Sequence, residues 1–192
     1  MQYIRAFSMI GALMLCSGLA DGASAQDEWS NRVPHQALAE GWTNPFPQAI
    51  FPVGTLLEQA NARTVVEFYD RMINAKDVAA ASELIGPDYD QHLLEFGNGR
   101  EGLAAYVADL AARLPGASVD VKRIVPDGEY VFLHSHFKED AGDLGSIAGD
   151  MFRLENGRIV ERWSVLHPIP EDPSPENPNG VFGGADDGSR RN

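Results

Sequence analysis

Two histidines one residue apart lie within an apolar and aromatic stretch of the sequence, FLHSHF at residues 132–137. Side chains alternate between the two faces of a strand, so His134 and His136 would point the same way. Imidazole exchanges protons near neutral pH and ligates metals. The pair therefore predicts a metal clamp, one wall of a ligand pocket, or a hydrogen-bonded pair without chemistry.

The metal interpretation meets an incomplete ligand set. The stretch follows a glycine with the spacing that begins a cupin metal motif, but the glutamate of that motif is missing and no second motif follows. His92 or His167 could complete a site across a cavity. We expect His134 and His136 to line a pocket without metal.

An acidic residue in a second apolar stretch, Asp150 in GDMFRLE, offers a carboxylate. In an apolar cavity, desolvation raises the pKa of a carboxylate toward the range in which it removes a proton next to a carbonyl. Asp150 alternates with Phe152, so both would face such a cavity. Pairing of Asp150 with Arg153 or Arg162 is the structural alternative.

The elements that position these residues follow from the hydrophobic period. Apolar residues at helical spacing predict helices over residues 56–77 and 100–116, with a short helix between them that begins at Asp77 and ends at Gly86. The period then changes to two, which predicts strands over residues 118–125, 129–139, 147–155 and 158–167, with a hairpin at Asn156-Gly157. This order predicts an α+β fold in which helices cover one face of an antiparallel sheet.

The N-terminus has the pattern of a cleaved signal peptide. One positive charge precedes an apolar run at residues 6–20, and Ala23-Ser24-Ala25 is a small-x-small cleavage signal. Cleavage of residues 1–25 would remove Cys16, the only cysteine, which excludes disulfides and thiolate chemistry in the mature chain. We expect a periplasmic or secreted protein that has no membrane segment after cleavage.

The remaining chain divides into three parts. Residues 26–56 predict an extended arm, residues 57–170 a single domain, and the Pro- and Gly-rich residues 171–192 a mostly disordered tail. The net charge is −13, and such an acidic surface would repel phosphate backbones. Nucleic acid is therefore excluded as a partner.

Several stretches between about residues 61 and 182 resemble the SnoaL-like branch of the nuclear-transport-factor-2-like superfamily. They are EFYDRMINAKD, PDYDQH, VFLHSHF, GDMFRLENGRIVERWSVLHPIPE and NPNGVF. The resemblance implies a cone-shaped α+β barrel, in which three helices wrap a strongly curved sheet and enclose a mostly apolar pocket. It also implies a homodimer. Members include polyketide cyclases of the aldol type, ketosteroid isomerases and proteins that only bind ligands.

The resemblance also implies site positions. His92 would lie at the entrance to the pocket, His134 and Asp150 would match positions that line it, and Trp163 would match the tryptophan after the hairpin. In the cyclases the next residue is an aspartate that acts as general acid and base, whereas this chain has Ser164. A serine hydroxyl does not exchange protons near neutral pH without a partner.

Two functions follow as hypotheses. In the first, the protein removes a proton next to the carbonyl of a hydrophobic small molecule, with Asp150 as base and His92 and His134 as proton relays or donors to the enolate oxygen. This chemistry requires no cofactor, and substrate contacts would come from Tyr69, His136, Phe152, Trp163 and Ser164. In the second, which the serine favours, the pocket binds its ligand without turnover.

Overall fold

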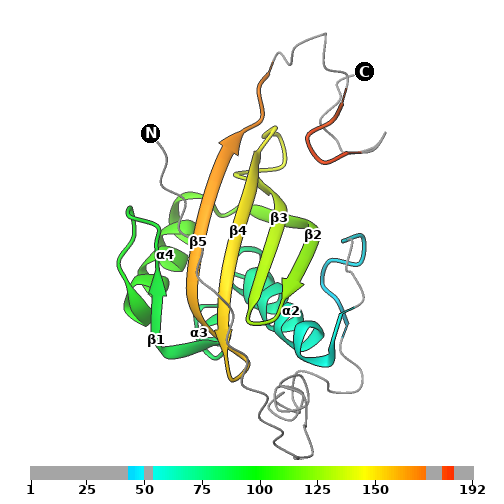
Figure 1. Ribbon diagram of the computed structural model, residues 1–192. Helices are drawn as coiled ribbons and strands as arrows, with labels where there is room; N and C mark the ends of the chain where they lie inside the picture. Colours follow the sequence, from blue (N-terminus) through cyan, green and yellow to red (C-terminus); the bar gives the residue numbers. More distant parts are fainter. Residues whose placement is uncertain (1–42, 50–53, 172–178, 184–192) are drawn as a thin grey trace, which may run out of the picture.

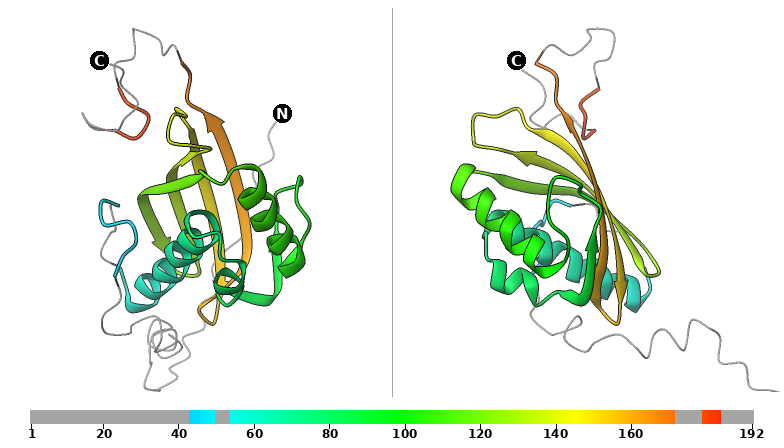
Figure 2. Two further views of the ribbon diagram at one scale, coloured as in Figure 1. Left: turned by 180° about the vertical axis from the view of Figure 1, so that it is seen from behind. Right: turned by 90° about the vertical axis from the view of Figure 1, so that its left-hand side faces the viewer.

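The computed structural model describes residues 43–49, 54–171 and 179–183. Helices lie on one side of a curved five-stranded sheet, as the two views of Figure 2 show. The predicted signal peptide, most of the predicted arm and most of the predicted tail lie outside the described residues. Within the described part, no helix is long and apolar enough to cross a membrane.

Three α-helices form among the described residues, in the order that the sequence predicts. Helix α2 spans Leu56–Tyr69 and begins with a capping box in which Thr55 and Glu58 exchange side-chain and backbone hydrogen bonds. It continues as a π-helical turn over Asp70–Asn74. Helix α3 spans Val78–Ser82 and is capped by Asp77 as predicted, and α4 spans Gly99–Arg113.

The strands are β1 (Ile85–Gln91), β2 (Ser118–Asp127), β3 (Tyr130–Lys138), β4 (Ser146–Glu155) and β5 (Arg158–Pro168), in the spatial order β1-β5-β4-β3-β2 (Figure 1). The four strands β2 to β5 form the antiparallel meander that the sequence predicts. Asn156 and Gly157 both have positive φ, which matches the tight turn expected between β4 and β5.

The strand β1 corrects the sequence prediction. The second helix was expected to end at Gly86, but Gly86 lies within β1, which pairs in parallel with β5. The sheet is therefore mixed rather than entirely antiparallel, within the α+β fold that the sequence predicts. Pro87 is tolerated because β1 lies at the sheet edge, where a missing backbone donor breaks no ladder. The buried side chains of Ile85 and Tyr89 anchor the strand.

The core lies between the helices and the sheet. Phe68 and Tyr69 of α2 make edge-to-face contacts with Phe152 of β4, at ring-centroid distances of 6.0 and 5.7 Å. Phe46, which precedes α2, joins the same core cluster. The strands thus turn one face toward the helices, and the opposite face, called the outer face here, carries the exposed side chains of Tyr130, Phe132, Met151 and Val165.

Candidate active site

A cavity of about 190 Å³ lies between α4, the end of α2 and the helix-facing side of the sheet. Its walls are mainly apolar and include Ile73, Leu93, Phe96, Leu110, Leu114, Val119, Phe137, Ala148 and Leu166. Six polar side chains also line it: Tyr69, Tyr106, Asp109, Arg113, Arg162 and Ser164. Apolar walls with a few convergent polar groups are the usual composition of a small-molecule site.

A buried ion pair underlies this cavity. Arg162, which is 3% exposed, donates from Nη2 to Asp150 Oδ1 at 3.1 Å, and Asp150 is completely buried. The guanidinium also lies over the rings of Tyr69 and Phe152, at 5.6 and 5.9 Å from their centroids. Asp150 therefore pairs with Arg162, which was one of the alternatives that the sequence left open. It does not line the cavity itself, whereas its partner Arg162 does.

Tyrosine hydroxyls surround the ion pair. Burial, and next the negative charge of Asp150, raise the pKa of Tyr69 well above its ordinary value. Burial also raises the pKa of Tyr89 and Tyr106, against the opposing effect of the Arg162 charge. Burial alone would lower the pKa of Arg162, but the tyrosines and Asp150 outweigh it and raise that pKa. The tyrosines therefore keep their protons, and Arg162 is a permanent cation.

Ser164 stands directly opposite Asp150 in the β4–β5 ladder. Cross-strand partners point to the same face with their Cβ atoms about 4.5–5.5 Å apart. Within the described residues, neither Ser164 Oγ nor Asp150 Oδ2 has a hydrogen-bond partner. The two oxygens thus leave hydrogen-bonding capacity open beside the cavity, and Ser164 itself lines it.

The structure places His134 and His136 on the outer face, and not in the cavity as the sequence led us to expect. Their neighbours Leu133 and Ser135 point toward the helices and are fully buried. Both imidazoles pack against Phe182 of the C-terminal segment, with ring centroids 5.3 and 4.8 Å apart. The register of β3 is the reason for the difference, because Leu133 and Ser135 take the inward positions and the histidines between and beside them take the outward ones.

One ring nitrogen of each histidine has a hydrogen-bond partner. His134 Nδ1 accepts from Arg123 Nη1 at 3.1 Å, and His136 Nε2 donates to the Leu144 carbonyl at 2.8 Å. Among the described residues, no three His, Cys, Asp or Glu side chains are grouped so as to hold a metal ion.

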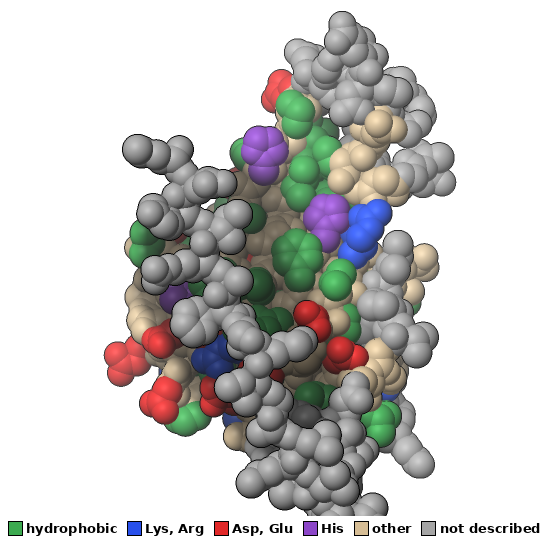
Figure 3. Space-filling view, in the orientation of Figure 1, with side chains coloured by type: hydrophobic (Ala, Val, Ile, Leu, Met, Phe, Trp, Pro, Cys, Tyr) green, Lys and Arg blue, Asp and Glu red, His purple; other side chains and the backbone are tan. Residues whose placement is uncertain are grey.

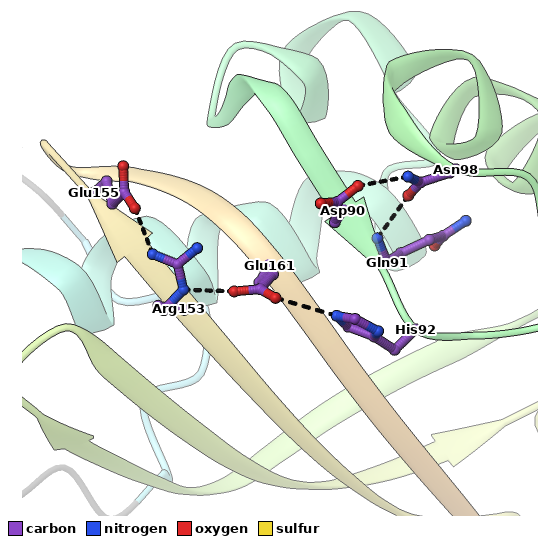
Figure 4. Close-up of polar contacts among 7 residues, drawn as sticks. All are labelled: Asp90, Gln91, His92, Asn98, Arg153, Glu155 and Glu161. Atoms are coloured by element: carbon purple, nitrogen blue, oxygen red, sulfur yellow. Dashed lines mark hydrogen bonds and ion pairs between the residues drawn. The ribbon is translucent and has the colours of Figure 1, made fainter.

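His92 and Trp163 also lie together outside the cavity. Their rings stack in parallel with centroids 4.7 Å apart. His92 Nε2 lies 3.3 Å from a carboxylate oxygen of Glu161, which in turn pairs with Arg153 (Figure 4). Trp163 and Ser164 are neighbours on one strand and point to opposite faces, so only Ser164 reaches the cavity.

The remaining predicted contacts divide between the cavity and the core. Tyr69 lines the cavity, whereas Phe152 is fully buried behind Tyr69 and Arg162. Sequence reasoning treated Arg162 only as a possible partner of Asp150, and it missed Tyr106 as a cavity residue. Strand alternation carried a signal for Arg162, because it lies two residues before Ser164 and so shares its face.

Helices pack on one face of a curved, open sheet, with a cavity between helices and sheet. The chain belongs to the SnoaL-like domain family, which matches residues 65–162. This confirms the resemblance drawn from the sequence. No curated protein sequence matches the chain significantly.

Two of the crystal structures that share the fold illustrate the likeness. A candidate polyketide cyclase from Bacillus cereus ATCC 10987 has a TM-score of 0.54 at 18% identity, covering 64% of this chain and 86% of the other. A candidate SnoaL-like polyketide cyclase from Jannaschia sp. CCS1 has a TM-score of 0.51 at 21% identity, covering 60% and 91%. These likenesses establish the α+β fold with helices packed on the sheet.

Proposed function

We propose that this SnoaL-like protein binds a hydrophobic carbonyl compound in the cavity and catalyses removal of a proton next to the carbonyl. One observation carries the proposal: Ser164 lines the cavity opposite the buried Asp150, and each has an oxygen without a hydrogen-bond partner in the described part of the chain. The pair would supply the proton acceptor that a lone serine lacks.

In the proposed step, the substrate C–H bond breaks and its proton passes to Ser164 Oγ. The serine gives its own proton to Asp150 Oδ2 in the same step, after its side chain turns to donate to that oxygen, because the two oxygens are not hydrogen-bonded in the structure. The electron pair of the C–H bond forms the enolate, whose negative oxygen faces Arg162 and the tyrosine hydroxyls in the cavity. Return of the proton to another carbon completes an isomerisation, and attack of the enolate on a second carbonyl completes an aldol closure.

Arg162 is the group best placed to stabilise the enolate. Its cation lies in a buried site, where electrostatic stabilisation is stronger than in water. Tyr69 and Tyr106 line the same cavity and keep their protons because their pKa values are raised. These groups would hold the substrate oxygen before and after the proton moves.

A binding module without turnover is the second candidate. It is favoured by the complete burial of Asp150 and by its ion pair with Arg162, which together keep the carboxylate away from direct contact with a ligand. In that case the same cavity and polar groups would hold a ligand, and no proton would exchange.

Proton exchange separates the two candidates. The protein is incubated in D₂O with 2-tetralone, and deuterium uptake next to the carbonyl is followed by NMR. We expect catalysed uptake that falls by about a hundredfold in Ser164→Ala, the usual size of a general-base contribution. Val165→Ala, the next residue on β5 but 72% exposed, is the matched control and should leave the rate unchanged.

Two results would count against the enzyme. Binding of 2-tetralone without catalysed uptake would leave the binding module. Loss of uptake in His134→Asn, with Ser164→Ala unaffected, would move the chemistry to the outer face.

We also propose that the protein is exported and acts as a homodimer. Export is supported by the pattern of residues 1–25, and it would leave a mature chain that begins at Gln26. Mass measurement of the protein recovered from periplasm or medium tests this directly.

A further inference from the structure

The volume of the cavity limits what it can hold. At about 190 Å³ it is slightly larger than a cavity of about 150 Å³ that accepts benzene. It is smaller than the roughly 300 Å³ at which sites for drug-sized molecules begin. The space fits one substituted ring or two fused rings. A four-ring compound would leave much of its apolar surface in water.

The cavity is closed at its buried end. Tyr69, Ile73, Val119, Ala148 and Arg162 line it there and are themselves buried, whereas Arg113 and Leu166 line it and are exposed. A ligand therefore enters between α4 and β5 and meets Arg162 with its inner end. Ala148 is the smallest of the buried lining residues, so its side chain leaves part of the space open.

The charges at the buried end favour an uncharged ligand. The cation of Arg162 is already matched by Asp150, and Asp150 Oδ2 has no partner among the residues described. A ligand carboxylate would lie close to that anion after losing its own hydration, which is unfavourable without a further cation. The net charge of −13 repels anions as well. A neutral oxygen meets no such penalty and can accept from Arg162 or the tyrosines.

Building on the proposed function, we infer that the ligand is an uncharged compound of one or two rings with a single carbonyl or phenol oxygen at its inner end, rather than a polycyclic or anionic one. Ala148 is the residue that sets the room available for the inner ring.

Three fluorescent probes test size and charge separately on the full-length protein at neutral pH. They are 2-naphthol, its anionic counterpart 2-naphthoate, and the four-ring phenol equilenin. We expect 2-naphthol to bind at least about tenfold more tightly than either of the others. Tighter binding of equilenin would overturn the size limit, and tighter binding of 2-naphthoate would overturn the charge limit, while both would leave the cavity as the binding site. Failure of all three to bind would overturn the proposed function as well.

Two substitutions test the assignment to this cavity. Ala148→Leu fills its buried end and should weaken 2-naphthol binding by about tenfold. Ala105→Leu, on the exposed side of α4, is the matched control and should not change it. Leu114→Ala enlarges the cavity and is the alternative test if Ala148→Leu does not fold. It should shift the preference toward equilenin by about fivefold. An unchanged preference in a folded variant would contradict the inference.

Discussion

The two faces of the sheet carry similar chemistry-bearing side chains in different surroundings. On the face toward the helices, Asp150 and Arg162 lie buried beneath a cavity. On the outer face, His134 and His136 pack against Phe182. Hydrophobic side chains are also exposed on the face of the molecule that Figure 3 shows. Both faces hold groups that can exchange protons, and the cavity described above adjoins the first.

The difference teaches where a titratable group can act on a ligand. The outer histidines already use ring nitrogens in contacts with Arg123 and Leu144. The inner pair keeps Asp150 Oδ2 and Ser164 Oγ without partners in the described structure. A buried polar atom without a partner is unfavourable, so its presence beside a cavity indicates a place that a ligand can complete.

The largest expected effect compares the ion pairs of the two faces. Replacement of Arg162 by Met leaves the buried Asp150 without its partner, which should lower the free energy of unfolding by about 3–5 kcal/mol. Arg153→Met is the matched control on the outer face, where Arg153 pairs with Glu161 and Glu155 (Figure 4). These pairs are partly exposed, so the loss should stay below about 1 kcal/mol. Urea denaturation measures both, and equal losses would contradict the comparison.

The second prediction places a new carboxylate on each face in turn. Ser164→Asp places a second carboxylate next to Asp150, at a position that lines the cavity. A carboxylate beside Asp150 has its pKa raised by the like charge, which makes it a better base. Deuterium uptake by 2-tetralone should rise by about tenfold. Val165→Asp on the outer face should leave uptake unchanged. A folded Ser164→Asp variant without faster uptake would contradict the proposal.

The elements of the fold were largely predictable, and the exception has a physical reason. Periodicity and turn signals predicted three helices and the meander of four strands. The strand β1 was missed because Gly86, Pro87 and two aspartates interrupt its pattern. What holds it is pairing with β5, which lies about seventy residues further along the chain. Local sequence contains little of that information.

The site was predictable only in part, because the face of each strand depends on its register. Trp163 and Ser164 are adjacent, so alternation alone excludes one of them from the cavity. Which one it excludes follows from the pairing of Ser164 with Asp150, together with the bulge next to Arg153. Both faces of β3 carry large apolar or aromatic side chains, so composition does not tell which face turns toward the helices. The packing of Phe182 on the outer face is a contact between distant parts of the chain, which the sequence does not reveal.

A third prediction concerns what covers the exposed part of the outer face. Val125, Tyr130, Phe132, Met151 and Val165 are each between 39% and 72% exposed. We propose that a second copy of the chain covers them, since exposed apolar surface of this kind is typical of interfaces. Phe132→Lys should weaken dimerisation by about tenfold, measured by analytical ultracentrifugation. A wild-type monomer at micromolar concentration would contradict the proposal.

The smallest expected effect is a pH dependence that belongs to the outer face. Burial, and next the positive charge of Arg123, lower the pKa of His134 below its ordinary value of 6.5. Burial also lowers the pKa of His136, while its bond to Leu144 opposes the change and the nearby Lys138, Lys122 and Asp120 have smaller effects. Both histidines are therefore neutral in the folded protein at pH values where they are protonated in the unfolded chain.

The sign follows from proton binding. Because the folded state binds fewer protons, stability is full above the ordinary pKa of 6.5 and falls as the pH drops through the lower values of the folded state. Protonation of His134 also removes the acceptor for Arg123 and places two cations together beside Phe182. Thermal denaturation is measured at one pH above 6.5 and one below it. The melting temperature should differ less between the two pH values in the double variant His134→Asn/His136→Asn than in the wild type. Equal shifts would mean that the acid sensitivity lies elsewhere, in the carboxylates shared by both proteins.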